Sequence, residues 1–249
     1  HTHMHAQVSF SSMGNPNFPL ISTILPDIVD LKLYDNNLKE LPRTINKLTA
    51  LRSLALADNL LESLPDEMGG LSNLATLYLS RNSLTSLPDK LPHMSALTDL
   101  RLDMNMLERL PNQFGQLYNL RRLQLEHNRL RDLPMSCMNL TALEVLNLEF
   151  NELVLIAGVH NMVSLKVLIL SHNVLTSVPA GIGNLKVLNT LHLSYNQLGS
   201  LSLELGHATA LTHTLTLPQC TNVSRSAPRR APVVRRREYS MCIPARSPR

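Results

Sequence analysis

A 23-residue repeat runs through most of the chain and restricts what it can fold into. The repeated pattern is L-x-x-L-x-L-x-x-N-x-L-x-x-L-P, followed by two apolar residues three positions apart. Eight units begin at Ile28, Leu51, Leu74, Leu97, Leu120, Leu143, Leu165 and Leu188, and the interval is 23 residues except for 22 after Leu143. A unit of this size buries its apolar face only against neighbouring units. The sequence therefore predicts a stacked array of units in place of a single globular core.

The first half of each unit predicts a short strand with one buried face. Leucines alternate with other residues, as in Leu54-Ala55-Leu56, and this is the two-residue period of a strand. Successive units then place their strands side by side in a parallel sheet. Eight such strands, about 4.8 Å apart, would form an inner face roughly 35–40 Å long.

One asparagine recurs just after each predicted strand, where the chain must turn. Its short amide can bond to the turn backbone and to the next unit, and so satisfy groups that would otherwise be buried without partners. We expect a structural ladder of eight side chains: Asn36, Asn59, Asn82, Asn105, Asn128, Asn151, Asn173 and Asn196.

The second half of each unit predicts a return segment with a short helix. A Leu-Pro pair such as Leu41-Pro42 opens it, and proline suits the first turn of a helix. The apolar residues that follow, such as Ile45 and Leu48, then share one helical face. The sixth unit carries Ile156-Ala157 at this point and has lost one residue, so we expect a tighter or irregular return there.

These patterns predict an α/β fold with a curved parallel sheet on the concave side and short helical or irregular segments on the convex side. Residues 1–27 are expected to be a partly disordered lead-in, and residues 28–211 a solenoid of eight repeats. Residues 212–249 are expected to contain a degenerate last repeat and a basic disordered tail. Because the register is lost abruptly near Thr212, we expect this end to be an alternative C-terminus on a longer array.

The basic character of the chain belongs to one segment. Residues 225–249 contain eight arginines and one glutamate, a net charge of +7 within a total of +4, so residues 1–224 carry −3. A uniformly basic surface for nucleic acid is therefore not indicated, and we do not expect nucleic acid as a partner. The segment itself could contact acidic partners, membranes or RNA, or serve as a nuclear address; a solvated tail is the simpler interpretation.

Cysteine usage and hydropathy favour a cytoplasmic protein. Cys137, Cys220 and Cys242 are odd in number and far apart, so no disulfide framework is indicated. Cys137 falls inside a repeat and is interpreted as a small core residue. No apolar run reaches the roughly 18 residues of a membrane span, and the first residues lack the basic region of a signal peptide.

The repeat resembles the leucine-rich repeat, and the return Leu41-Pro-Arg-Thr-Ile45-Asn-Lys-Leu48 is similar to its 23-residue intracellular class. That class includes the Ras-group proteins and the Shoc2/Sur-8-like scaffolds, and the resemblance covers residues 28–211. It implies a protein partner such as a Ras-family GTPase or the catalytic subunit of a phosphatase. Residues 7–10, Gln-Val-Ser-Phe, loosely resemble a phosphatase-docking peptide; the alternative is an unstructured lead-in.

Side chains between the strand leucines should point away from the core, because strand side chains alternate. These positions vary between units, and in the middle units they hold the aromatic and arginine residues that anchor protein interfaces. Acidic residues such as Asp99 and Glu149 would add charge complementarity. The predicted partner-binding residues on the concave face are Tyr78, Arg101, Asp103, Arg122, Gln124, Glu126, Phe150, His172 and Tyr195.

The sequence thus predicts an intracellular protein-binding scaffold or adaptor in signalling. The alternative is a recognition module of a larger enzyme, such as a kinase, cyclase or ubiquitin ligase. No phosphate-binding loop, nucleophile elbow or paired nucleophile and base is present, so we expect neither catalysis nor a cofactor, metal or small-molecule substrate.

Overall fold

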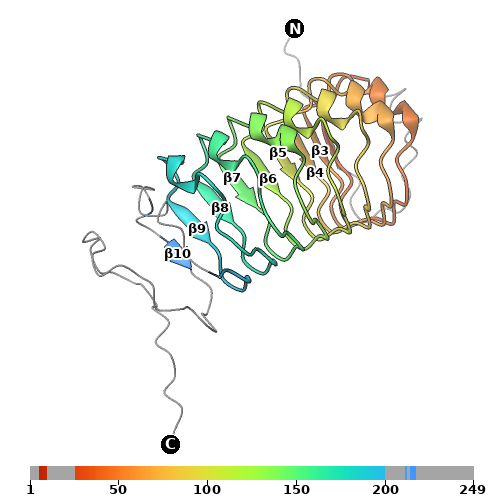
Figure 1. Cartoon of the computed structure of the whole chain (residues 1–249). Helices are drawn as coiled ribbons and strands as arrows, with labels where there is room; N and C mark the ends of the chain where they lie inside the picture. The colour runs from red at the N-terminus through yellow and green to blue at the C-terminus, as the bar shows by residue number, and fades with distance from the viewer. Residues whose placement is uncertain (1–5, 10–25, 200–210, 212–213, 217–249) are drawn as a thin grey trace, which may run out of the picture.

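The chain forms one long parallel sheet that curves along its length. The computed structural model describes residues 6–9, 26–199, 211 and 214–216, and its strands follow one another in chain order across a ten-stranded sheet (Figure 1). The strands are β1 (Ala6–Ser9), β2 (Ile28–Lys32), β3 (Ser53–Ala55), β4 (Thr76–Tyr78), β5 (Asp99–Arg101), β6 (Arg122–Gln124), β7 (Val145–Asn147), β8 (Val167–Ile169), β9 (Thr190–His192) and β10 (Thr214–Thr216). The predicted leucine-rich-repeat solenoid is therefore confirmed.

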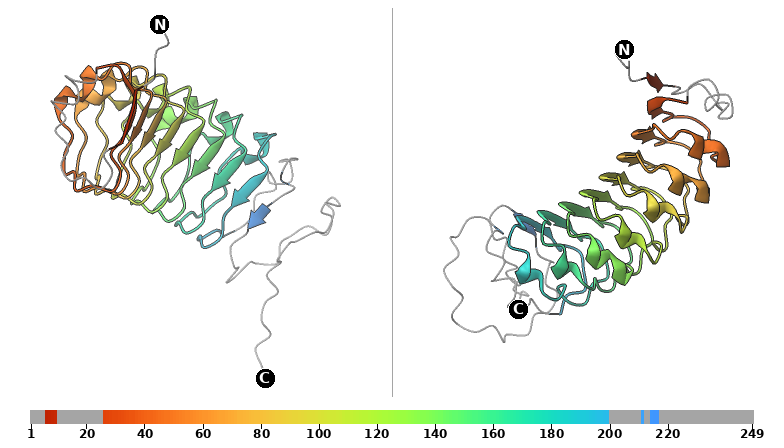
Figure 2. Two further views of the ribbon diagram at one scale, coloured as in Figure 1. Left: turned by 180° about the vertical axis from the view of Figure 1, so that it is seen from behind. Right: turned by 90° about the horizontal axis from the view of Figure 1, so that it is seen from above.

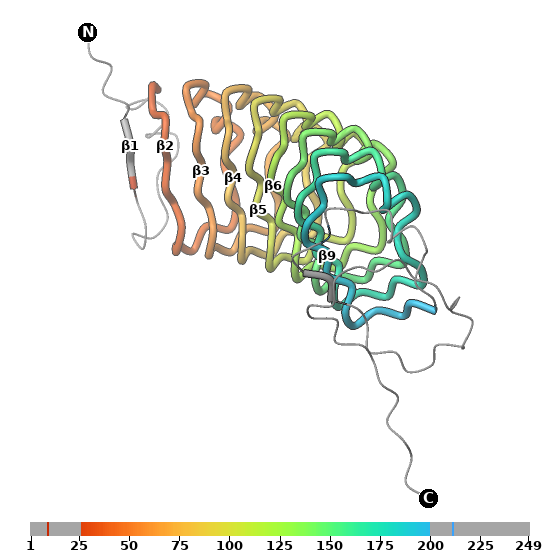
Figure 3. Tube along the Cα trace, turned by 90° about the vertical axis from the view of Figure 1, so that its left-hand side faces the viewer, coloured from red at the N-terminus to blue at the C-terminus, as the bar shows by residue number. Residues whose placement is uncertain are grey.

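Short 3-10 helices occupy the return segments. They are η1 (Arg43–Lys47), η2 (Asp66–Gly70), η3 (Leu91–His93), η4 (Phe114–Gln116), η5 (Met135–Asn139), η6 (Val159–Asn161) and η7 (Ile182–Asn184). Figure 2 shows the strands on the inner side of the arc and the helices on the outer side. The tube in Figure 3 shows that each unit is one coil stacked on the next. The sheet is therefore the concave face.

The tight helix type follows from the spacing of the apolar pair. In η1 the Ile45 amide donates to the Pro42 carbonyl and the Leu48 amide donates to the Ile45 carbonyl, at 3.0 and 3.1 Å. Three residues per turn align Ile45 with Leu48, and both are buried. The proline is extended at the N-cap (φ −71°, ψ 149°), not in the first helical turn as the sequence suggested.

The core is a ladder of leucines in strict register. Leu54, Leu77, Leu100, Leu123 and Leu146 pair across β3–β7 and are fully or almost fully buried. Each contributes about 1.5–3 kcal/mol when removed from water. Cys137 belongs to this core as predicted, and burial raises the pKa of its thiol to about 12, which keeps it protonated at neutral pH.

The eight asparagines connect neighbouring units. The side-chain amide of Asn105 donates to the carbonyls of Leu79, Leu102 and Asp103 at 2.9, 3.1 and 3.2 Å. Its oxygen accepts from the Leu84 amide at 3.0 Å. Asn59, Asn82, Asn128, Asn151, Asn173 and Asn196 make the corresponding contacts with their own and the preceding unit, and Asn36 bonds to turn carbonyls. Each of the seven asparagines from Asn59 onward thus joins a turn to the coil before it.

The residue before each asparagine has a left-handed backbone. Its φ lies between 53° and 56° in all eight units: Asp35, Asp58, Arg81, Met104, His127, Phe150, His172 and Tyr195. This turn ends the strand, so the inner strands β3 to β9 have three residues each. Backbone hydrogen bonds nevertheless continue to the turn, as from the Asp58 amide to the Ser80 carbonyl at 3.0 Å.

The sixth unit has the irregular return that the sequence predicts. Gly158 adopts φ 72° and precedes η6, and the bond from the Leu153 amide to Asn173 spans one residue fewer than its counterparts. Gly181 adopts the same φ before η7. In both units a glycine takes a conformation that other residues adopt at a cost.

Two strands lie outside the solenoid limits of residues 28 and 211. β1 pairs with β2, so residues 7–9 lie in a strand and not in an unstructured lead-in. β10 pairs with β9, and Leu215 is opposite Leu191. The predictions of disorder for residues 217–249 and for most of residues 1–25 concern positions outside the described residues, and Cys220 and Cys242 also lie there.

Candidate binding face

The predicted binding residues lie on or beside the concave sheet. Tyr78, Arg101, Arg122 and Gln124 lie in β4, β5 and β6, next to buried leucines that point the other way. Asp103 and Glu126 follow β5 and β6, whereas Phe150, His172 and Tyr195 occupy the left-handed turns after β7, β8 and β9. The sheet therefore brings all nine residues to one side of the molecule.

A charged cluster occupies the middle of this face. We call Tyr78, Asp99, Arg101 and Arg122 the concave cluster. Asp99 is only 7% exposed, and its two carboxylate oxygens contact Arg101 Nε at 3.4 Å and Arg122 Nη1 at 2.8 Å. The Arg101 guanidinium lies 4.5 Å from the centre of the Tyr78 ring. Partial burial opposes its charge, but the hydrogen bond and charge of Asp99 raise the pKa of Arg101. Asp99 therefore fixes two potential anchor arginines.

Three acids form a second feature, the acid row of Asp103, Glu126 and Glu149. They follow β5, β6 and β7, which are adjacent and in register. Burial, and the charges of Asp103 and Glu149, raise the pKa of Glu126, although its own backbone hydrogen bond opposes this. Among the described residues, Glu126 Oε2 and Gln124 Oε1 are enclosed acceptors with no hydrogen-bond partner. Enclosed acceptors without a partner are costly to the folded state.

Replacing Glu126 with glutamine is expected to stabilise the protein at neutral pH. The raised pKa means that the folded chain holds this proton more tightly than the unfolded chain, so stability falls as pH rises through the raised value. The melting temperature of Glu126→Gln should exceed that of wild type at pH 7, and the gap should close below pH 4.5, the ordinary value for this carboxyl. Glu62→Gln, an exposed acid away from the row, is the control. A gap that persists at low pH would show that charge is not the cause.

Four rings stack along the carboxyl ends of the strands. We call His127, Phe150, His172 and Tyr195 the ring stack. Successive ring centres are 4.3, 4.0 and 4.1 Å apart, with interplanar angles of 9°, 12° and 15°. Phe150 is 39% exposed and Tyr195 is 60% exposed. The stack therefore forms an aromatic strip at the surface, at a spacing set by the strands.

The ring stack was not predicted as a unit. Phe150, His172 and Tyr195 were predicted on this face as separate residues, but strict strand alternation would direct them to the core, and it is the left-handed turn that sends them outward. A signal was present in the sequence, because Met104, His127, Phe150, His172 and Tyr195 occupy the same position in consecutive units. The buried role of Asp99 between two arginines also needed the structure.

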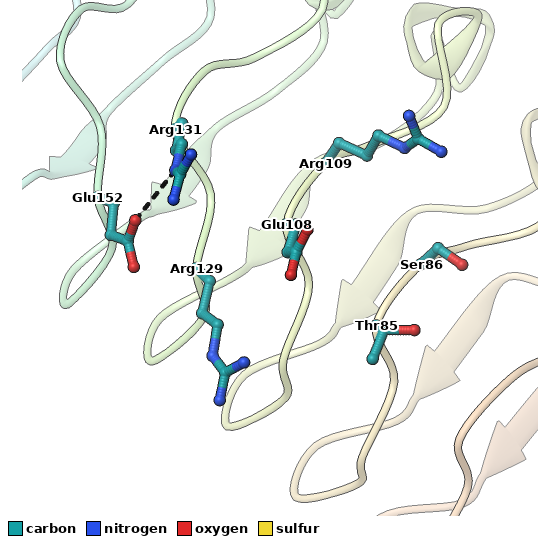
Figure 4. Close-up of a pocket in the computed structure, with 7 residues that line it drawn as sticks. All are labelled: Thr85, Ser86, Glu108, Arg109, Arg129, Arg131 and Glu152. Atoms are coloured by element: carbon teal, nitrogen blue, oxygen red, sulfur yellow. Dashed lines mark hydrogen bonds and ion pairs between the residues drawn. The ribbon is translucent and has the colours of Figure 1, made fainter.

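A shallow polar groove lies on the chain segments that follow the asparagines. It is lined by Thr85, Ser86, Glu108, Arg109, Arg129, Arg131 and Glu152. Arg131 pairs with Glu152 at 3.2 Å, and Figure 4 shows the remaining side chains without a common point of convergence. This arrangement does not define a ligand site.

The described residues hold no group of three or more histidine, cysteine, aspartate or glutamate side chains placed to bind a metal ion. In the same part of the chain, no helix is long and apolar enough to cross a membrane.

Family comparisons agree with the repeat. The family "Leucine rich repeat" matches residues 49–107 and 95–153, and a second model, also described as "Leucine Rich Repeat", matches residues 164–185. Together these matches cover 127 of the 249 residues, just over half of the chain. No curated protein matches the chain significantly.

Solved structures with the same architecture come from bacteria and plants. A leucine-rich-repeat protein of Leptospira interrogans is 32% identical with a TM-score of 0.62, over 80% of this chain and 57% of its own. The ectodomain of the Arabidopsis thaliana receptor kinase GASSHO1/SCHENGEN3, in complex with CASPARIAN STRIP INTEGRITY FACTOR 2, is 27% identical (TM-score 0.67) over 83% of this chain and 28% of its own. The Arabidopsis receptor kinase HAESA, in complex with the peptide hormone IDA and the co-receptor SERK1, is 28% identical (TM-score 0.61) over 69% of this chain and 30% of its own.

This chain therefore spans little more than half of the bacterial protein and about a third or less of these receptor chains. Leucine-rich repeats generally serve as non-catalytic modules for protein–protein interaction.

Proposed function

Since this chain belongs to the leucine-rich-repeat family, we propose that it is a protein-binding scaffold or adaptor whose partner docks on the concave face. The observation that supports this most strongly is the concave cluster, where Asp99 holds Arg101 and Arg122 beside Tyr78. Side chains held in place lose little conformational freedom on binding, which favours affinity. Arginine and aromatic residues are also the types that dominate interface energies.

The finer assignment also belongs to this proposal. We propose an intracellular, cytoplasmic protein in signalling, with a Ras-family GTPase or a phosphatase catalytic subunit as partner, on the resemblance of the 23-residue returns to the Ras-group and Shoc2-like class. Residues 28–211 are the proposed limits of the binding array. The receptor kinases among the similar structures support the alternative, in which the repeats are the recognition module of a larger enzyme such as a kinase.

A pull-down with matched surface variants tests the proposal. Wild type is compared with Arg101→Ala/Arg122→Ala/Phe150→Ala and with Arg109→Ala/Arg131→Ala/Tyr118→Ala, which likewise removes two arginines and one aromatic residue, from exposed sites off the sheet. Captured proteins are quantified by mass spectrometry. We expect at least one protein to be retained by wild type and the control but reduced about tenfold or more by the concave variant, since two or more anchors are worth over 1.4 kcal/mol.

The result that contradicts the proposal is a set of captured proteins that is unchanged by the concave variant, or reduced equally by both variants. Melting temperatures of the three proteins are compared first, so that a loss of folding is not taken for a loss of binding.

A further inference from the structure

The repeat itself does not require the ring stack. A positive φ favours glycine, asparagine and aspartate, and bulky residues there are uncommon. The first two units do carry Asp35 and Asp58 at this position, the third and fourth carry Arg81 and Met104, and the fifth to eighth carry rings. Stacking returns about 0.5–1.5 kcal/mol per aromatic pair, but Phe150 and Tyr195 remain exposed. An exposed aromatic strip of this kind is characteristic of a surface that contacts another segment.

The acid row lies beside the ring stack and indicates that a segment bound there would carry positive charge. Glu126 and Glu149 directly precede His127 and Phe150 of the ring stack, and Asp103 precedes Met104 in the adjoining unit, so the acid row continues from one end of the ring stack and overlaps it in two units. Among the described residues, these three acids form no ion pair, while both nearby arginines contact Asp99. A nucleic acid backbone would be repelled here. A cationic segment would be attracted, with aliphatic stems against the ring edges and charged ends at the acids.

We propose that the basic tail of this same chain, residues 225–249, docks along the acid row and the ring stack. It carries eight arginines and one glutamate, against the −3 of the preceding residues. Arginine suits both features, because its planar guanidinium binds carboxylates through two hydrogen bonds and packs against aromatic rings. The tail lies outside the described residues, and its position on the face is the content of the proposal.

The chain is long enough for this contact. β10 ends at Thr216 and is three strands from β7, about 14 Å at 4.8 Å per strand. The eight residues 217–224 can span up to about 28 Å before the first arginine. A tethered segment acts at an effective concentration of about millimolar, so a weak contact is sufficient for occupancy. A docked tail would cover the face proposed for a partner, and the partner would have to displace it.

The test uses the full chain and one synthetic probe, a fluorescent peptide of residues 225–240. Peptide binding is measured by anisotropy on wild type and on a tail-neutral chain in which all eight tail arginines are glutamine. We expect the tail-neutral chain to bind the peptide about tenfold more tightly, because in wild type the tail already occupies the site. Binding should weaken strongly at ~0.5 M salt, where surface charges are screened.

Two matched charge variants locate the contact, both made in the tail-neutral chain. Asp103→Asn/Glu126→Gln/Glu149→Gln should weaken binding of the peptide about tenfold. Glu62→Gln/Glu108→Gln/Asp132→Asn removes three exposed acids that lie off the sheet, and should leave affinity within about twofold. Tyr195→Ala should weaken binding of the peptide by about threefold or more if the ring stack takes part.

The proposal is overturned if the tail-neutral chain does not bind the peptide, if wild type binds it equally well, or if both acid triples weaken it to the same extent. It is also overturned in its ring-stack part if Tyr195→Ala has no effect. None of these measurements involves a partner protein, so failure here leaves the proposed function untouched, and the pull-down above can fail independently.

Discussion

Replacing Asn105 with alanine is expected to lower the free energy of unfolding by about 3 kcal/mol. The side chain is 8% exposed and makes four hydrogen bonds to backbone groups of its own and the preceding unit. Alanine leaves the Leu84 amide without its acceptor and removes a donor from three carbonyls. A buried polar group left unsatisfied costs about 1–3 kcal/mol, and water cannot enter the closed turn without further disruption.

Asn119→Ala is the matched control. Asn119 makes one side-chain bond, to the Ser95 carbonyl at 2.8 Å, and it is exposed. Its loss should cost about 0.5 kcal/mol or less. Urea unfolding followed by circular dichroism compares the free energies of unfolding of the two variants. In thermal unfolding, the melting temperature of Asn105→Ala should fall by roughly 6–12 °C. Equal shifts in the two variants would refute the ladder as a main source of stability.

Replacing Gly115 with alanine is expected to destabilise the array to a similar or greater extent, by about 3 kcal/mol or more. A Cβ built on Gly115, in η4, would lie 1.8 Å from the carbonyl oxygen of Ser136 and 2.5 Å from its carbon. These are backbone atoms of the next coil, which a rotamer change cannot move. The two coils would have to separate, and this separation would disturb the packing between units on which a solenoid depends.

Gly70→Ala controls for glycine replacement itself. Gly70 is in η2, and the nearest atom to its added Cβ is the Cβ of Asn46 at 3.4 Å. This substitution should be neutral, or stabilising by up to about 1 kcal/mol through a less flexible unfolded chain. The same unfolding assay compares them, together with the soluble yield. If the Gly115→Ala and Gly70→Ala variants unfold at the same urea concentration, close packing of the coils at η4 and η5 does not limit the stability of the array.

The periodic features of this protein were predictable because they are local. Alternation identified Leu54, Leu77 and Leu100 as core residues, and the fixed interval implied that their strands align in parallel. The asparagine position followed from the need to satisfy turn backbone. These inferences need only the two-residue strand period and the rule that buried polar groups find partners.

Other features depended on how units meet. The pairing of β1 with β2 has no repeat signature in residues 6–9, and it arises because an open sheet edge accepts a strand. The 3-10 type of the return helices, by contrast, follows from the three-residue spacing of the apolar pair within each unit, such as Ile45 and Leu48.

The amino-acid sequence alone determined the solenoid, its leucine core and its asparagine ladder, since each unit repeats the same short-range pattern. Only the tertiary structure decided that His127, Phe150, His172 and Tyr195 become one stack, and that Asp99 holds two arginines. Residues 22 or 23 positions apart come within 4.3 Å only after neighbouring coils dock in register. The left-handed turn then directs their side chains outward, away from the core that strand alternation would have assigned to them.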